Sequence, residues 1–409
     1  MNEKFILRKD HLTGFLRKLS KGHRLVAPVR NRYGDLMFQV IDSLETTDLD
    51  LSEQAQESPK AFFLPQEEVL FSYEASGGIY DFRPINNSEQ TVYFGLRSCD
   101  ISAILYMDVI FLRSPRDDHY MKKRKDSILI SIGCNTPGEN CFCNATRTGP
   151  FLEYGFDLQF TDLGDRFFVE SGRARGDEIF SEWPQFFHPV TEEDVRLQYQ
   201  LALEAKAGFR RQIHVEPAFS KLRDDAVDTA VWREMASRCD GCGGCAYICP
   251  TCTCFTIFDR MESTETGKRI RAWDSCTHAG FTRMAGGHNP VDMKIDALRR
   301  RFMHKLYYDY SAFRRPSCVG CGRCVDMCFG GVDIVKFIDI VCAGTRKRTR
   351  DSRRILGDLL LEAGLISRTD LEKALSRQAD TGEALGKILM DLGLVTCAEI
   401  LGVLSLENM

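Results

Sequence analysis

Features that would place this chain in a membrane or give it a nucleotide-binding fold are missing from the sequence. A membrane-spanning helix needs about 18 or more consecutive apolar residues. The most apolar region here, residues 92–112, is interrupted by Arg97, Asp100 and Asp108. The first residues carry charges throughout and contain no apolar signal-peptide core. No G-x-G-x-x-G follows a strand pattern and opens a helix, so the usual dinucleotide-binding fold is not expected.

The bulk composition is that of an ordinary globular protein. The chain has 409 residues, of which 44% are hydrophobic and 27% charged, enough for two or three domains with separate cores. A net charge of −4 gives no reason to expect nucleic acid or an anionic membrane as a partner. The 17 cysteines would suggest disulfides in a small secreted chain. In a chain of this length we expect metal-bound thiolates in a reducing, cytoplasmic compartment.

Two cysteine runs in the second half share the spacing C-x2-C-x2-C-x3-C. Bacterial-type ferredoxins hold two [4Fe–4S] clusters with such runs, and the fourth cysteine of each run binds the cluster of the other. Zinc sites favour separate C-x2-C pairs over four cysteines in one run, so zinc is the weaker alternative, as are disulfides. The predicted ligands of cluster 1 are Cys239, Cys242, Cys245 and Cys328, and those of cluster 2 are Cys318, Cys321, Cys324 and Cys249.

Four further cysteines, in glycine-bearing segments of the first half, indicate a third [4Fe–4S] cluster. They are Cys99, Cys134, Cys141 and Cys143. Backbone amides near glycine can approach and hydrogen-bond cluster sulfurs. The alternative is that they are buried free cysteines, which are common in protein cores. Because their spacing is irregular, the prediction of this cluster 3 is weaker than that of the two runs.

The remaining cysteines have no clear ligand pattern. Cys252, Cys254 and Cys276 follow the first run, and we expect them to pack in the core or around a cluster. An alternative is that they leave a cluster iron open to a substrate. Cys342 and Cys397 are expected to be plain hydrophobic residues.

Hydrophobic patterning predicts an α+β multidomain protein. Residues 1–20 have a helical pattern, and alternating segments predict strands and helices over a first α/β domain, residues 1–190. A helical lead-in and a two-cluster ferredoxin-like domain with a long insertion follow, over residues 191–342. Residues 343–354 form a basic segment, interpreted as a linker, and residues 355–409 a small all-α repeat domain. The predicted strands are residues 24–29, 36–41, 69–74, 91–96, 127–132, 156–161 and 166–170, and the predicted helices 99–111, 192–210 and 218–237.

The last segment contains an internal repeat. Leu356–Gly357 recurs 29 residues later as Leu385–Gly386, and each copy has a turn followed by Ser367 or Thr396 as a helix cap. This pattern resembles the N-terminal helical domain of type II secretion and type IV pilus ATPases, some of which bind a cyclic dinucleotide. The second copy has Glu383 and Glu407 where the first has Arg354 and Gln378. Carboxylates at those positions disfavour phosphate binding, so docking is the preferred role.

Residues 1–342 resemble the β-subunit of cytosolic sulfhydrogenases and, equally, the A subunit of anaerobic sulfite reductase. The segments that carry the resemblance are Gly95–Asp100, Gly133–Asn135, Asn140–Cys143, Thr161–Asp165, Cys249–Phe255, Trp273–Cys276 and Gly286–Pro290. The resemblance implies an iron–sulfur subunit that relays electrons between a flavoprotein linked to NAD(P) or ferredoxin and a catalytic redox subunit. One departure is Phe329, which follows Cys328 where the ferredoxin pattern usually has proline.

The sequence also lacks the C-x2-C pairs of a nickel centre and the cysteine spacing that joins a sirohaem to a cluster. Without a hydride-accepting or substrate-binding centre, the chain is expected to carry single electrons only. Two alternatives remain. One is a redox or nucleotide sensor that uses the C-terminal domain. The other is a sulfur-compound reductase subunit with its own substrate-binding cluster.

Overall fold

The computed structural model describes residues 3–85, 89–351, 357, 360–361, 363–381, 385–396 and 399. The chain forms two compact units, Met1–Val341 and Cys342–Met409, and each is described by itself. Cys397, and Arg354, Glu383 and Glu407 of the repeat, lie outside the described residues, as does the side chain of Gln378. No helix in the described part of the chain is long and apolar enough to cross a membrane.

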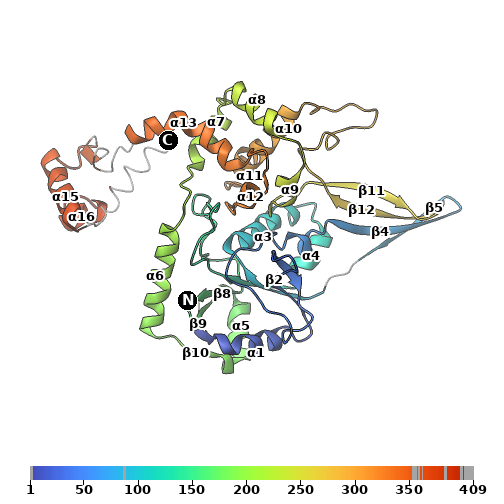
Figure 1. The fold of residues 1–409 in the computed structure, drawn as a ribbon, viewed down its shortest axis with the longest axis horizontal. Helices are drawn as coiled ribbons and strands as arrows, with labels where there is room; N and C mark the ends of the chain where they lie inside the picture. The colour runs from blue at the N-terminus through green and yellow to red at the C-terminus, as the bar shows by residue number, and fades with distance from the viewer. Residues whose placement is uncertain are drawn as a thin grey trace. The chain divides into compact units, whose positions relative to one another are not determined.

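An eight-stranded sheet forms the centre of the first unit (Figure 1). Its middle strands β2, β6, β7 and β8 are parallel, and antiparallel strands complete both sides. The predicted strands of this region, and hence the mixed α and β fold class, are confirmed. In spatial order the strands are β10 (Phe187–Pro189), β1 (Lys4–Arg8), β9 (Arg166–Ser171), β8 (Leu158–Asp162), β7 (Ser127–Ile132), β6 (Thr91–Leu96), β2 (Arg24–Arg30) and β3 (Leu36–Val40).

Both faces of this sheet are covered by helices, because its central strands are apolar on both sides. Val92 and Phe94 of β6 belong to the core shared with α1, whereas Tyr93 and Leu96 belong to the core shared with α3. The helices and helical turns that accompany the sheet are η1 (Lys9–His11), α1 (Leu12–Leu19), α2 (Lys60–Phe63), α3 (Ser98–Phe111), α4 (Asp118–Lys125), α5 (Ala174–Glu182) and η2 (Pro184–Phe186).

The prediction of one helix over residues 1–20 is wrong in its first third. Residues Lys4–Arg8 form β1, which pairs with both β9 and β10, and α1 begins only at Leu12. The loosely periodic leucines and phenylalanines fit either structure locally. This segment forms a strand because it pairs with two neighbouring strands and buries Leu7.

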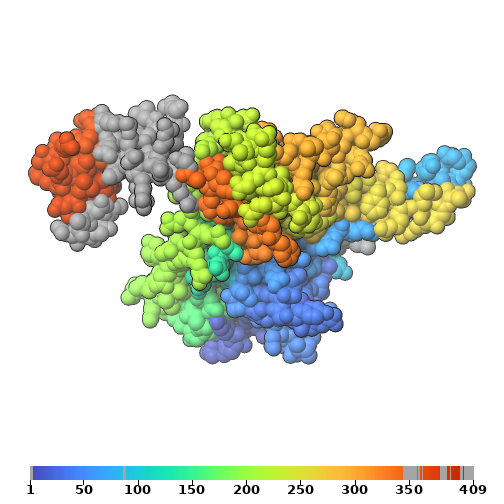
Figure 2. Space-filling view, turned by 45° about the horizontal axis from the view of Figure 1, so that its top comes forward, coloured from blue at the N-terminus to red at the C-terminus, as the bar shows by residue number. Residues whose placement is uncertain are grey.

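A second, four-stranded sheet joins two hairpins that lie far apart in the sequence. The insertion after the first cysteine run contributes β11 (Phe255–Met261) and β12 (Thr266–Trp273), and β12 pairs with β4 (Glu67–Ser76), which pairs with β5 (Ile79–Pro84). Figure 2 shows the two hairpins side by side on the surface, in yellow and light blue. The predicted boundary at residue 190 thus lies between strands of one sheet, and the division there stays a prediction.

Helices surround the two cysteine runs. The predicted helix over residues 218–237 is two helices, because Asp225 adopts a left-handed backbone conformation with φ 50° between them. Trp232, Phe302 and Phe337 stack on one another and fix α8, α10 and α13 together. The bounds are α6 (Glu192–Ala207), α7 (Val215–Arg223), α8 (Thr229–Arg238), α9 (Gly244–Tyr247), α10 (Lys294–Met303), the π-helical turn η3 (His304–Tyr308), α11 (Asp309–Phe313), α12 (Arg323–Met327) and α13 (Ile334–Asp351).

The second unit has the helical repeat that the sequence predicts. Its helices α15 (Arg368–Thr381) and α16 (Leu385–Asp391) share a leucine-rich core with Leu360 and Val395. Ser367 exchanges hydrogen bonds with Asp370, and Thr396 makes the same exchange with Glu399. These two capping boxes occupy equivalent positions in the two copies of the repeat, and they confirm the predicted Ser and Thr caps. The basic segment continues α13 as helix up to Asp351.

Deleting the residues after about 343 is expected to leave iron content and melting temperature of the first unit unchanged. The first half of α13 belongs to that unit, since Phe337 is fully buried and Lys221 donates a hydrogen bond to the carbonyl of Val341. The repeat buries its leucines within its own unit. Iron analysis and thermal unfolding of the truncated protein check this, with truncation before Ile334 as the damaging control.

Candidate metal centres

Each cysteine run adopts the same local structure. A glycine with a left-handed backbone, Gly243 in the first run and Gly322 in the second, opens a short helix, α9 or α12. The third cysteine of the run lies in the first turn of that helix, and the fourth follows its end. Backbone N–H groups of Gly241 and Gly320 point at the sulfurs of Cys239 and Cys318, at 3.4 and 3.5 Å. Such N–H···S contacts stabilise thiolates.

The structure brings together the four cysteines predicted for cluster 2. Cys318, Cys321 and Cys324 of the second run interact electrostatically with one another and with Cys249 of the first. The fourth cysteine therefore does reach the other run. Burial raises the pKa of Cys318 to about 12, so a thiolate at this position requires positive charge beside it.

The segments that carry the cluster 1 cysteines also meet. Helices α9 and α12 are in contact, and a Cβ on Gly244 would lie 3.3 Å from Met327. Cys239 and Cys245 interact electrostatically, and a Cβ on Gly330 would lie 2.3 Å from the carbonyl oxygen of Arg238. The sulfur of Cys328 accepts the N–H of Val332 at 3.1 Å. Cys242 is exposed, so this group of cysteines reaches the surface.

The topology of the central sheet places Cys99 beside Cys134. They follow β6 and β7, which are adjacent and parallel, so both strands end at the same edge of the sheet. Cys99 lies in the first turn of α3, where the helix dipole favours a thiolate, whereas burial raises the pKa of Cys99 well above its usual value. Cys143 interacts electrostatically with Cys134 and Cys141, and Cys99 interacts with Cys143. All four cysteines predicted for cluster 3 are thus neighbours.

The loop of Cys141 and Cys143 lies directly against the second cysteine run. Phe142 donates its N–H to the carbonyl of Gly320 at 2.8 Å. A Cβ on Gly320 would lie 2.6 Å from the carbonyl oxygen of Phe142, and one on Gly322 would lie 2.7 Å from that of Asn140. Only glycine fits at both positions, which also have positive φ. As a result, Cys99, Cys141 and Cys143 all interact with Cys321 of the cluster 2 group.

Arg323 occupies the space between the two groups. Its Nη1 lies 2.8 Å from Oδ1 of Asp100, and both side chains are almost fully buried, at 2% and 0% exposure. Burial opposes its charge, but Asp100 and the Cys321 and Cys99 sulfurs raise the pKa of Arg323. Neither terminal nitrogen of Arg323 has a well-aligned hydrogen-bond acceptor among the described residues. These buried N–H groups are suited to the sulfides of a cluster.

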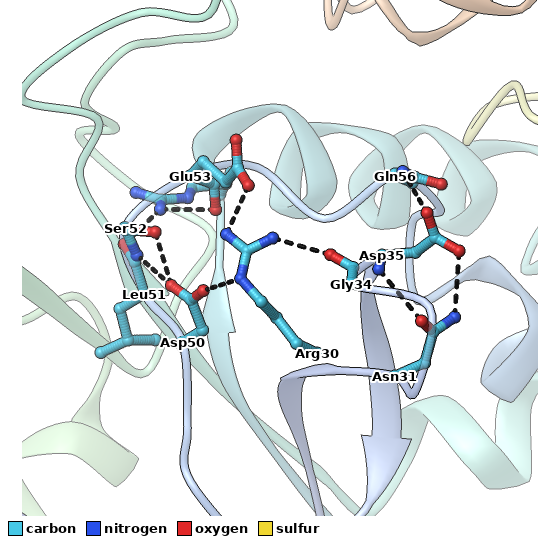
Figure 3. Close-up of polar contacts among 10 residues, drawn as sticks. Arg30, Asn31, Gly34, Asp35, Asp50, Leu51, Ser52, Glu53 and Gln56 are labelled. Atoms are coloured by element: carbon cyan, nitrogen blue, oxygen red, sulfur yellow. Dashed lines mark hydrogen bonds and ion pairs between the residues drawn. The ribbon is translucent and has the colours of Figure 1, made fainter.

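A loop over residues 50–56 also contacts this region. Figure 3 shows how Arg30 holds the loop. Arg30 holds the loop by ion pairs to Asp50 at 2.7 Å and Glu53 at 2.6 Å. Held in this way, the loop presents Gln54, whose amide contacts the sulfur of Cys99 at 2.9 Å, and the carbonyl of Ala55, which accepts Nε of Arg323 at 3.0 Å.

Three buried cations surround the first run. Lys60 donates to the carbonyl oxygens of Tyr247 and Cys249, Arg301 to that of Cys245, and Lys305 to that of Thr251. Their exposures are 3%, 6% and 3%. Burial lowers the pKa of Lys60. It opposes the charge of Arg301 and Lys305 as well, but cysteine sulfurs, led by Cys245 for Arg301 and Cys249 for Lys305, raise the pKa of these two groups.

These buried cations fit an anionic occupant. A buried cation is costly unless an opposite charge compensates it, and thiolate-bound clusters supply such a charge. Burial first raises the pKa of Cys249, but Lys305 and Arg301 bring it below its usual value. Within the described ranges, no three His, Cys, Asp or Glu side chains are arranged to hold a single metal ion.

Cys252, Cys254 and Cys276 also lie together, next to the cluster 2 group. Cys254 is hydrogen-bonded to both other thiols, and Cys252 interacts with Cys249. The hydrogen bond from Cys254 lowers the pKa of Cys276 to about 6. Cys342 is buried in α13, as expected for a hydrophobic role.

Sequence reasoning missed the charged and polar residues around these cysteines. Arg97, which donates to the carbonyls of Leu51 and Glu53, belongs to a segment that carries the family resemblance, and Arg323 lies inside the second run. The positions of Arg97 and Arg323 close to cysteines in the sequence indicate a role near a cluster. The sequence gives no such signal for four other residues, which approach from distant segments: Gln54, Lys60, Arg301 and Lys305.

Comparison with known proteins agrees with this arrangement. The family model described as a 4Fe-4S dicluster domain matches residues 238–332. Sulfhydrogenase 2 subunit beta of Pyrococcus furiosus is 31% identical over 338 residues, which cover 83% of this chain and 98% of that protein. The predicted sulfhydrogenase resemblance and the predicted iron–sulfur clusters of the dicluster domain are confirmed. The likeness of residues 355–409 to secretion ATPases stays a prediction. The chain belongs to the family of sulfhydrogenase β-subunits and is an electron-transfer iron–sulfur protein.

Proposed function

We propose that the chain conducts single electrons through three [4Fe–4S] clusters held by the twelve cysteines that the sequence predicts. The observation that carries this proposal is the convergence of Cys99, Cys134, Cys141 and Cys143 beside Cys321. Because the cluster 3 cysteines lie directly beside the cluster 2 cysteines, electrons can pass from one cluster to the next. Bound clusters supply one-electron redox chemistry, and this chain's residues hold, space and charge-balance them.

The route runs from cluster 3 through cluster 2 to cluster 1. Cluster 2 occupies the middle because Cys321 contacts the cluster 3 group, whereas Cys249 interacts with Cys245 of the cluster 1 group. The cluster 1 end opens to the surface at Cys242. Phe329 there is 95% exposed and Met327 is 39% exposed. We assign this end to contact with a redox partner.

The proposed partners are suggested by the family. The relative's name identifies it as the β-subunit of a sulfhydrogenase. We propose that this chain likewise works in a cytoplasmic, multi-subunit oxidoreductase, between a flavoprotein linked to NAD(P) or ferredoxin and a catalytic redox subunit. The second unit, Cys342–Met409, is proposed as a docking module.

Iron and sulfide analysis of anaerobically purified protein tests the three-cluster proposal. We expect about 12 iron atoms per chain, since each [4Fe–4S] cluster contributes four. The protein should accept electrons from dithionite but reduce neither NAD(P)+ nor sulfite and take up no hydrogen. About eight irons would remove cluster 3, whereas zinc in place of iron, or steady turnover by the pure subunit, would refute the relay.

Replacing Phe329 with aspartate is expected to weaken transfer to a redox partner without loss of iron. An exposed aromatic residue at a contact can contribute about 2 kcal/mol, so the KM for the co-purifying partner should rise roughly tenfold or more. Phe82→Asp is the matched control, because Phe82 is a 58% exposed aromatic on β5, distant in sequence from both runs. Equal effects of both changes would contradict an electron exit at cluster 1.

A further inference from the structure

Three cysteines outside the proposed ligand sets meet at the open end of the β11–β12 hairpin. Cys254 directly precedes β11, and Cys276 follows β12. The register Phe255↔Trp273 and the hydrogen bond from the N–H of Asp274 to the carbonyl of Cys254, at 3.1 Å, bring the two segments together. Cys252 approaches from the loop after the first run. The hairpin therefore builds a cysteine site that the two-run ferredoxin pattern does not contain.

The three cysteines are close neighbours, and the side chains of Cys252 and Cys276 both interact with that of Cys254. The thiol of Cys254 is hydrogen-bonded to the sulfurs of both Cys252 and Cys276. Cys252 and Cys276 are buried, at 6% and 5% exposure, and Cys254 is half-buried. A disulfide requires two cysteine backbones to approach closely, and the paired ends of the hairpin bring the segments of Cys254 and Cys276 together. The described residues also offer no geometry for a single ion here.

The site adjoins the proposed relay. The N–H of Cys252 donates to the carbonyl of Cys249 at 3.2 Å, and Cys249 belongs to the cluster 2 group. Thr251 lies between Cys249 and Cys252 in the sequence, and buried Lys305 donates to its carbonyl oxygen at 2.9 Å and to its hydroxyl oxygen at 3.0 Å. Lys60 and Arg301 also act on Cys252. These cations stabilise negative charge that arrives on either cysteine.

From this geometry we propose that Cys254 and Cys276 form a two-electron dithiol–disulfide centre that exchanges electrons with cluster 2. Oxidation forms one S–S bond, releases two protons to solvent and passes two electrons, one at a time, to the [4Fe–4S] relay. Reduction takes the electrons and protons back and breaks the bond. Cys252 is the hydrogen-bonding neighbour between this centre and Cys249. The centre couples single-electron transport to a two-electron step, and its electron exchange rests on the proposed relay function.

The test uses the full-length holoprotein, poised anaerobically with oxidised or reduced dithiothreitol, quenched in acid, alkylated in denaturant and mapped by mass spectrometry. In the oxidised sample we expect a covalent link between the peptides that contain Cys254 and Cys276. Dithionite, acting through the clusters, should remove it. Cys276→Ser should abolish the link, while Cys252→Ser and Cys342→Ala, a buried cysteine of α13, should preserve it. Iron content should stay at the wild-type level in all three variants.

Each other outcome has a distinct meaning. Full iron with no Cys254–Cys276 link at any poise overturns the inference and leaves the relay intact. A loss of about four irons in Cys276→Ser overturns it by making the cysteine a cluster ligand. A Cys252–Cys254 bond overturns the proposed pairing. Wild-type protein without iron overturns the proposed function, and with it the exchange with cluster 2.

Discussion

Replacing Arg323 with methionine is expected to destabilise the first unit by about 3–5 kcal/mol, the cost of leaving one partner of a buried ion pair uncompensated. Arg323 is the closest cation to Asp100, at 2.8 Å, and Asp100 is 0% exposed on its side chain. The same change removes positive charge beside Cys99 and Cys321. Reduction adds an electron to a cluster, and a nearby positive charge favours that electron. Arg323→Met should therefore also lower the reduction potentials of clusters 2 and 3.

Chemical denaturation measures the first effect and a redox titration followed by electron paramagnetic resonance the second. Arg323→Lys should keep most of the potential, since it keeps the charge. Adding Asp100→Asn to Arg323→Met should recover part of the stability. Arg299→Met is the control, because Arg299 pairs with Asp225 at the surface, where such pairs contribute less than about 1 kcal/mol. An unchanged potential in Arg323→Met would contradict its position between two clusters.

The local structure of the two cysteine runs can be predicted from the sequence because their spacing is local. C-x2-C-x2-C-x3-C within one run specifies a left-handed glycine, a short helix and a following cysteine, which is what α9 and α12 with their flanks provide. The central strands β6 and β7 are equally readable, since they are short apolar runs bounded by turn signals. Their parallel pairing then accounts for the proximity of Cys99 and Cys134.

Non-local features could not be predicted in the same way. The pairing of β4 with β12 joins segments about 200 residues apart, and nothing in either hairpin specifies its partner. Lys60 reaches the carbonyls of the first run from the N-terminal half of the chain, and Gln54 reaches Cys99 from a loop. Local patterning predicts a helix over β1, because its strand partners β9 and β10 lie more than 150 residues away and leave no local signal.

The structure also changes how cluster 3 is best tested. A fragment of residues 1 to about 190 contains all four predicted ligands, but it lacks Gly320 and Gly322, against which the Cys141–Cys143 loop packs. It also lacks Arg323, the partner of Asp100. Loss of iron from such a fragment would therefore have two explanations. Point changes in the whole chain separate ligand loss from loss of packing.

Cys141→Ala in the full-length protein is expected to lose about four of about twelve irons, and no others. Cys141 interacts with Cys134 and Cys321, and its sulfur faces the carbonyl of Cys321 at 3.6 Å, so its loss removes a ligand at the cluster 3 end of the route. Because thiolate ligation contributes folding free energy, the melting temperature should fall as well. Iron analysis and the loss of one set of paramagnetic signals measure the effect.

The control is Cys342→Ala, which removes a buried cysteine of α13 that belongs to none of the proposed ligand sets. It should cost a few kcal/mol of packing at most and leave iron unchanged. If Cys141 is only a buried hydrophobic residue, Cys141→Ala will behave in the same way, folded and with full iron. The variant should also keep the cluster 1 and cluster 2 signals on dithionite reduction while the cluster 3 signal is lost. Retention of full iron and of all three signals would remove cluster 3 from the route.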